Sequence, residues 1–172
     1  MTPQEFLADI LDPGLQFLTK LGGPPPTPEV RRFLLCVAMQ ESGPDLDARY
    51  QTGDGDSAGP ARGFWQFERG GGVTGVLNHP ASRALANLLC ASLHVKPISS
   101  AVWRALEGHD ILAVCFARLL LLTDPQTVPT DEDAAWECYV KRLWRPGAPH
   151  HNTWHRNWVA ADAAVKASAT SP

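Results

Sequence analysis

Apolar positions recur at helical spacing along most of this chain, and alternating strand patterns are almost absent. The first stretch, 3–21, predicts one or two short helices with a break near Asp12-Pro13-Gly14, followed by a proline-rich connector over 22–26. Further helices are expected at 28–42, 81–94, 98–107, 109–123, 131–143 and 152–167, with a short one after a glycine turn at 70–72. Residues 44–62 are predicted as a polar loop and 63–68 as an extended aromatic strip.

The helix from Pro28 is the most clearly delimited of these elements. Thr27 is a typical N-cap, Pro28 suits the first turn, and Gly43-Pro44 stops the helix. One face follows the i, i+3, i+4, i+7, i+8 rule through Val30, Phe33, Leu34, Val37 and Ala38. The next position of that series carries an acid instead of a hydrophobe.

That acid is Glu41, in the last turn of the predicted helix. Burial against apolar neighbours disfavours its charged form, and so does the partial negative charge at a helix C-terminus. Both effects raise the pKa, and a carboxylic acid that stays protonated near neutral pH is suited to general acid catalysis. The alternative is a helix-end glutamate that turns into solvent.

Size and composition set the remaining limits. The 172 residues suit one domain, and an apolar content of 44% is enough for a core. A net charge of −3 gives no electrostatic case for nucleic acid. No signal peptide is visible and the longest apolar run, 111–122, is too short for a bilayer, so we expect a monomer made in the cytoplasm without membrane insertion. Four cysteines in helical runs are expected to be buried thiols, with disulfides as the alternative outside a cell.

The aromatic strip is the second candidate for chemistry. Gly63-Phe64-Trp65-Gln66-Phe67 combines flat ring surface with an amide that both donates and accepts hydrogen bonds. Sugars bind to such combinations, and Gly63 would let the backbone approach a ligand closely. The alternative is a core strand with Phe and Trp packed inward.

Together, Glu41-Ser42 and the strip that follows resemble the lysozyme-like superfamily, closest to goose-type lysozymes and soluble lytic transglycosylases. The resemblance covers about 28–68. Trp65 stands where Met is usual, and the Ala-Tyr-Asn-Ala-Gly segment of transglycosylases has no counterpart. The resemblance implies a mainly α fold in which 1–172 form one lysozyme-like domain with a small irregular or hairpin-like insert. Its parts would be a helical extension, the catalytic segment and a helical remainder, at 1–26, 27–68 and 69–172.

The resemblance also implies roles for single residues. Glu41 would be the catalytic acid, and Tyr139 looks like the late tyrosine of these families, although it also suits an ordinary packed aromatic. The substrate would be the glycan strands of peptidoglycan, cut at the MurNAc-β-1,4-GlcNAc bond by a phage or prophage muralytic enzyme, free or part of a particle. Trp144 is expected to border the cleft, and the predicted substrate-binding residues are Ser42, Gly63, Trp65, Gln66 and Tyr139.

Two chemical outcomes stay open. A lytic transglycosylase needs only Glu41, whereas an inverting hydrolase needs a second carboxylate about 6.5–9.5 Å away. The candidates for that second carboxylate are Asp54, Asp56 and Glu68. No metal or cofactor is expected, because the G-x-G-x-x-G match at 70–75 lacks a βαβ context and the three histidines at 150, 151 and 155 have no nearby acid or cysteine.

Two other function classes compete with this interpretation. One is a helical virion or partner-binding protein in which the acid is idle. The other is a chitinase similar to family 19, since Arg62-Gly63 resembles the Arg-Gly-aromatic-x-Gln strip of that family. Turnover of soluble chitin oligomers would favour the chitinase.

Overall fold

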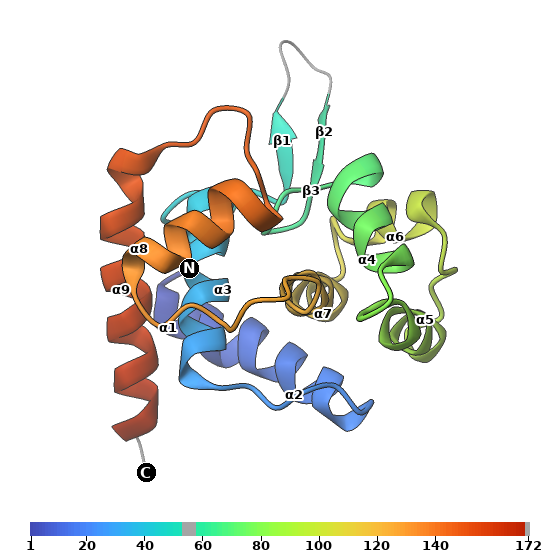
Figure 1. Cartoon of the computed structure of the whole chain (residues 1–172), viewed down its shortest axis with the longest axis horizontal. Coiled ribbons are helices and arrows are strands. Elements are labelled where there is room, and N and C mark those ends of the chain that lie inside the picture. The colour runs from blue at the N-terminus through green and yellow to red at the C-terminus, as the bar shows by residue number, and fades with distance from the viewer. Residues whose placement is uncertain (53–57, 171–172) are drawn as a thin grey trace.

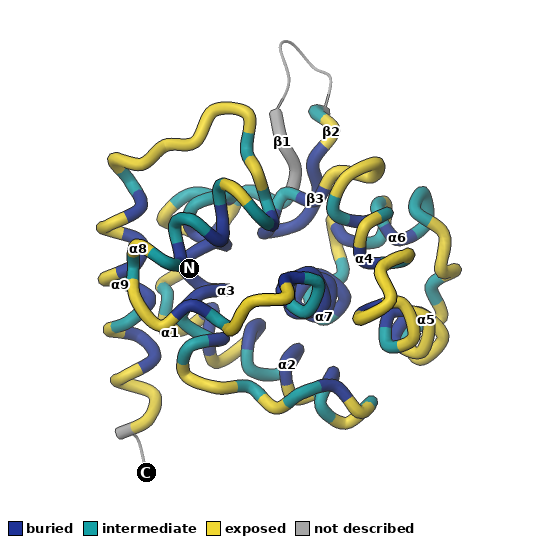
Figure 2. The backbone as a smooth tube through the Cα atoms, in the orientation of Figure 1, coloured by how far each residue is buried: buried dark blue, intermediate teal, exposed yellow. Residues whose placement is uncertain are grey.

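The computed structural model of the chain describes residues 1–52 and 58–170, and it is mainly helical, as the hydrophobic pattern predicts (Figure 1). Two helices, α3 (Pro28–Ser42) and α7 (Asp110–Leu121), run through the interior and are buried on almost every side (Figure 2). The shorter helices α4 (Thr74–Asn78), α5 (Arg83–Ser92) and α6 (Ser99–Ala105) lie on one side of them. On the other side, α8 (Glu132–Glu137) and the π-helical η3 (Cys138–Leu143) lead towards α9 (His151–Thr170).

The N-terminal helix is continuous, so the break predicted at Asp12-Pro13-Gly14 is wrong. α1 (Pro3–Phe6), the π-helical η1 (Leu7–Leu11) and α2 (Asp12–Lys20) follow one another without a gap. The N–H of Asp12 donates to the carbonyl of Leu7, five residues back, and this π-helical turn directly before Pro13 lets the helix continue past a residue that has no N–H to donate. A Cβ on Gly14 would lie 2.5 Å from Val114 Cβ, so this glycine allows α2 to approach α7 closely.

The central helix α3 has the predicted bounds. The Thr27 hydroxyl accepts a hydrogen bond from the N–H of Val30, and Gly43 ends the helix with a φ of +86°. The five apolar positions of the predicted face are all buried. α9 packs along α3, and the buried indoles of Trp154 and Trp158, four residues apart on one face, dock it onto the core.

A small antiparallel sheet interrupts the helices. Its strands are β1 (Tyr50–Thr52), β2 (Ala58–Arg62) and β3 (Phe67–Glu68), with β2 in the middle and Arg62 opposite Phe67. The prediction that 63–68 is extended is wrong for its first four residues, which form a turn between β2 and β3. In that turn Gly63 and Gln66 have positive φ angles, +72° and +47°, and the N–H of Gln66 donates to the carbonyl of Gly63 at 2.9 Å.

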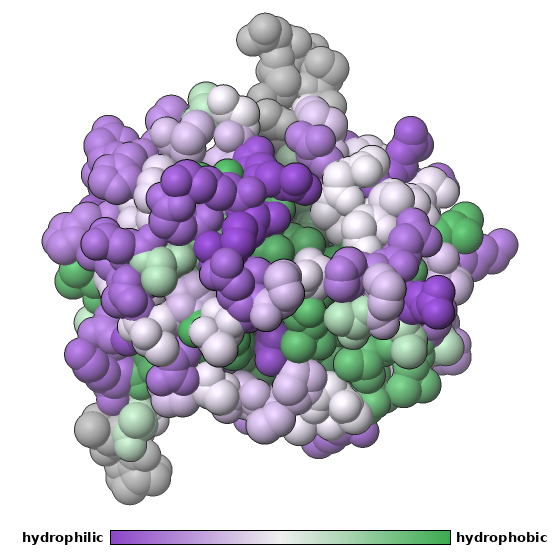
Figure 3. All heavy atoms as spheres, viewed as in Figure 1, coloured by the Kyte–Doolittle hydropathy of each residue, from purple (hydrophilic) through white to green (hydrophobic). Residues whose placement is uncertain are grey.

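The surface and the cysteines complete the picture. All four cysteines are buried and free, as predicted. Within residues 1–52 and 58–170, no helix is both long and apolar enough to cross a membrane. On the face seen in Figure 3, hydrophobic side chains gather around α5, which carries Leu88 with 47% of its surface exposed, whereas hydrophilic side chains cover α8 and η3.

Candidate active site

Glu41 lies in the last turn of α3, where the buried face of that helix reaches the surface. It is only partly buried, while its neighbours Met39 and Ser42 are almost fully buried. The carboxyl therefore has an apolar base and an open side. Glu41 therefore does not turn fully into solvent, which was the alternative.

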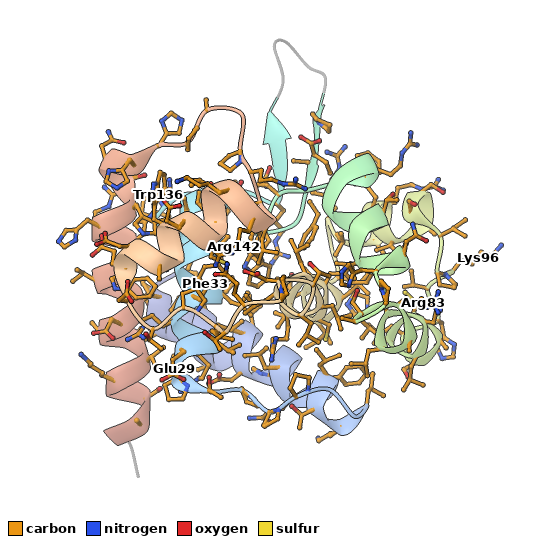
Figure 4. All side chains as sticks on the ribbon, viewed as in Figure 1. Glu29, Phe33, Arg83, Lys96, Trp136 and Arg142 are labelled. Carbon is orange, nitrogen blue, oxygen red and sulfur yellow. The ribbon has the colours of Figure 1, made fainter. Side chains whose placement is uncertain are left out.

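Tyr139 is the direct partner of this carboxyl. Its phenol donates a hydrogen bond to Oε1 of Glu41 at 2.8 Å across 98 positions of sequence. The ring is 3% exposed and stacks on Trp154 of α9, with ring centres 5.1 Å apart and planes 16° apart. Trp136 of α8 (Figure 4) contacts both rings, with its ring centre 5.6 Å from that of Tyr139 and 5.2 Å from that of Trp154. The C-terminal aromatic residues therefore hold the phenol in a fixed position beside Glu41.

The ionisation of this pair follows from its surroundings. Burial raises the pKa of Glu41 to about 7, the hydrogen bond from Tyr139 acts in the opposite direction, and the negative charge of Glu68 raises the pKa further. The pKa of the Tyr139 phenol is raised, first by burial and then by the charge of Glu41. At neutral pH the carboxyl is thus divided between acid and carboxylate while the phenol stays a donor. Such a group can both give and take a proton.

Trp65 does not lie where the sequence analysis predicts. Its ring is completely buried, Nε1 donates to the carbonyl of Leu34 at 2.9 Å, and the indole packs against Phe6 and Phe64. The prediction that this indole contacts a substrate is therefore wrong, and the core alternative is the correct one. The reason is the turn at 63–66, which directs the ring inward instead of along a strand face.

Trp144 is a second partly exposed indole near Tyr139, in addition to Trp136. Its ring centre is 6.4 Å from that of Tyr139, and its Nε1 donates to the backbone carbonyl of Trp65 at 3.0 Å. It also packs against Phe33 and Phe67. Trp144 thus offers, near the partner of Glu41, the kind of ring surface that the sequence analysis assigned to Trp65.

The remaining predicted substrate-binding residues differ in whether they have a polar group available to contact a ligand. Ser42 is 3% exposed and its hydroxyl donates to the carbonyl of Ala38, so the predicted ligand contact is not one that this hydroxyl can make. Gly63 is explained by its positive φ and by Leu106, whose carbonyl oxygen would lie 2.8 Å from an added Cβ. Gln66 is partly exposed, and its Nε2 donates to the carbonyl of Gly63 at 2.9 Å. A role for its amide oxygen stays a prediction.

Of the three candidates for a second carboxylate, the structure describes one. Asp54 and Asp56 lie outside the described residues. Glu68 is exposed at the end of β3, and its charge acts on Glu41. Two carboxyl groups are therefore near each other at this end of α3, although they come from positions 27 residues apart.

A pocket of about 490 Å³ adjoins Glu68. It lies between the sheet and α6, and none of its other lining residues was predicted as a site residue. Arg62, which the sequence analysis used only for a family comparison, forms one wall together with Trp103. The residues that line it are Gly59, Pro60, Arg62, Glu68, Arg69, Gly70 and Trp103.

Neither a metal site nor a comparison with known proteins adds residues to the candidate active site. In the described part of the chain, no group of three or more His, Cys, Asp and Glu side chains is arranged to hold a metal ion. No protein-family model, curated protein or solved structure matches this chain.

Proposed function

We propose that this protein is a lysozyme-like enzyme that cleaves the β-1,4 bond between MurNAc and GlcNAc in peptidoglycan, with Glu41 as general acid and then general base. One observation carries the proposal: a partly buried carboxyl at the end of a core helix has a pKa raised to about 7 and accepts a hydrogen bond from Tyr139. The motif-level resemblance to goose-type lysozymes and lytic transglycosylases supplies the substrate class.

The first step follows from the protonated form of Glu41. Its carboxylic acid protonates the oxygen of the leaving sugar while an oxocarbenium-like state develops. The hydrogen bond from Tyr139 then stabilises the carboxylate that remains. The partly exposed ring of Trp144 provides a surface on which the apolar face of a sugar can stack.

The second step has two forms. In the transglycosylase form, the Glu41 carboxylate takes the proton of the substrate's own C6 hydroxyl, and a 1,6-anhydro ring closes. In the hydrolase form, a second carboxylate activates water, and Glu68 is the described candidate for that base. The enzyme is made in a phage- or prophage-carrying cell and meets its substrate after release or as part of a particle.

The experiment is turnover of isolated cell-wall sacculi by wild type, by Glu41→Gln and by a control, Asp9→Asn, which neutralises an exposed carboxylate on the N-terminal helix. Wild type and Asp9→Asn are expected to release soluble fragments at similar rates, and Glu41→Gln to lose at least about 100-fold, the usual size of a general acid–base contribution. Mass spectrometry of the fragments separates anhydro ends from hydrolysed ends. Undiminished release by Glu41→Gln would remove this residue from the mechanism.

A negative result with wild type is also informative. If folded wild type leaves sacculi intact but cleaves soluble chitin oligomers, the chitinase alternative replaces the proposal. If it cleaves neither, the acid is idle and the protein acts by binding.

A further inference from the structure

The pocket beside Glu68 has a rigid wall built around Arg62. This side chain is 8% exposed, and its Nε lies 3.0 Å from Oε2 of Glu107. Its Nη1 donates to the carbonyls of Gly59 and Ala61. The guanidinium lies 4.2 Å from the centre of the Trp103 ring. The side chains of Arg62, Glu107 and Trp103 therefore hold one another in place.

Trp103 ties this wall to the sheet. Its Nε1 donates to the carbonyl of Pro60 at 2.7 Å, so α6 and β2 are joined at the pocket. The lining also includes two glycines, the partly buried Gly59 and the exposed Gly70, whose peptide groups have no side chains in front of them. A volume of about 490 Å³ lies within the range of roughly 300–1,000 Å³ that is usual for ligand sites.

The charges of the lining favour an anionic ligand. Two guanidinium groups, Arg62 and Arg69, face one carboxylate, Glu68, among the lining residues. Arg62 already has Glu107 as its partner, and the charge of Glu68 also acts on Glu41. Arg69 is exposed, and its guanidinium has no hydrogen bond or ion pair with any residue that the structure describes. Among the residues that the structure describes, the pocket lining thus contains one guanidinium without a partner, a bidentate donor group.

We propose that this pocket binds the peptide branch of the glycan substrate, with a carboxylate of the branch paired to Arg69. The inference rests on the proposed function, since it places the branch in the pocket while the scissile bond lies at Glu41. Glu68 links the pocket to the catalytic carboxyl, because it lines the pocket and its charge acts on Glu41. A sugar ring offers a guanidinium only uncharged oxygen acceptors, whereas a carboxylate matches its charge and its fork of N–H donors.

The kinetic test compares two soluble substrates: glycan chains that carry their peptides, and the same chains after an amidase has removed them. The measured quantity is the ratio of kcat/KM for the peptide-bearing chains to that for the peptide-free chains. Arg69→Gln is expected to lower this ratio about tenfold, which corresponds to one charge-assisted contact of about 1.4 kcal/mol. The matched control is Arg104→Gln. This exposed arginine of α6 donates from Nε to the carbonyl of Ser100 in its own helix and does not line the pocket.

The change in this ratio decides whether Arg69 binds the peptide branch. An unchanged ratio in Arg104→Gln and a lowered ratio in Arg69→Gln support the proposal. An equal effect of Arg69→Gln on both substrates, or none on either, overturns it. A raised ratio also overturns it, because that result means Arg69 recognises the lactyl carboxylate that becomes free when the peptide is removed.

A binding measurement separates this proposal from the proposed function. Glu41→Gln protein is titrated with a disaccharide-peptide from cell wall and with the peptide-free disaccharide, while NMR follows the indole N–H signals. The Trp103 signal is expected to shift with the disaccharide-peptide only, and the shift is expected to weaken in the Glu41→Gln, Arg69→Gln double variant. If wild type cleaves nothing and this shift is still seen, the pocket is supported and the catalytic proposal fails. If sacculi are cleaved and no shift occurs, the reverse holds.

Discussion

The Glu41→Gln substitution is predicted to stabilise the protein, and the gain should depend on pH. Burial raises the pKa of Glu41 from 4.5 to about 7. In the unfolded chain the carboxyl loses its proton near pH 4.5, whereas in the native state it keeps the proton until about pH 7. The unfolded state therefore releases a proton that the native state retains, and the free energy of unfolding falls as pH rises through this window.

The size of the effect follows from the same values. Each pKa unit corresponds to about 1.36 kcal/mol, so the shift corresponds to about 3 kcal/mol, and partial exposure of the carboxyl reduces this to about 2–3 kcal/mol. Glutamine has nearly the same shape and keeps an oxygen that accepts the bond from Tyr139, but it carries no charge. The variant should match wild type at pH 4 and exceed it by about 2–3 kcal/mol at pH 8.

Urea unfolding followed by tryptophan fluorescence at pH 4, 6 and 8 measures this difference. Asp9→Asn serves as the control, because it removes an exposed carboxylate and should show no comparable gain at pH 8. A difference between Glu41→Gln and wild type that stays constant with pH, or a less stable variant at pH 8, would refute the assigned burial of the charge. The outcome does not depend on whether the protein is an enzyme.

Three further predictions concern single residues near this site and in the core. Tyr139→Phe removes the bond that lowers the pKa of Glu41, so the pKa rises and the basic limb of the pH–activity profile should move to higher pH, with several-fold lower activity. Glu68→Gln removes a charge that raises the same pKa, so that limb should move to lower pH; a collapse of hydrolytic turnover instead would identify Glu68 as the second carboxylate. Arg118→Met should raise the free energy of unfolding in urea by about 1–3 kcal/mol, because Nε and Nη1 of this buried side chain have no hydrogen-bond partner in the described structure, whereas Arg118→Lys should show no such gain.

The sequence was sufficient to predict α3 and its acid because both depend on local signals. Thr27, Pro28 and Gly43 determine where the helix begins and ends, and the period of 3.6 residues determines which side chains face the core. Glu41 was recognisable because it occupies a position of the apolar series. These signals need no knowledge of the rest of the fold.

The direction of the side chains in the aromatic strip does not follow from the sequence pattern, because the backbone of the strip is not regular. A strand would place Trp65 and Phe67 on one face, but the positive φ angles at Gly63 and Gln66 close a turn and direct Trp65 into the core. The predicted break at Pro13 fails for a similar reason, since a π-helical turn accommodates the proline within a continuous helix. Irregular backbone of this kind leaves no clear period in the sequence.

The arrangement around Glu41 argues against a purely structural role for this residue. A leucine or methionine at the same place would extend the apolar face of α3 without a charge to desolvate. No basic side chain in the described part of the chain pairs with the carboxyl, and the one hydrogen bond, from Tyr139, leaves its pKa raised. The negative charge of Glu68 adds to the cost. A stability cost of about 2–3 kcal/mol above neutral pH, expected in a protein whose total stability is of the order of 10 kcal/mol, is the cost that the proposed role in proton transfer would require.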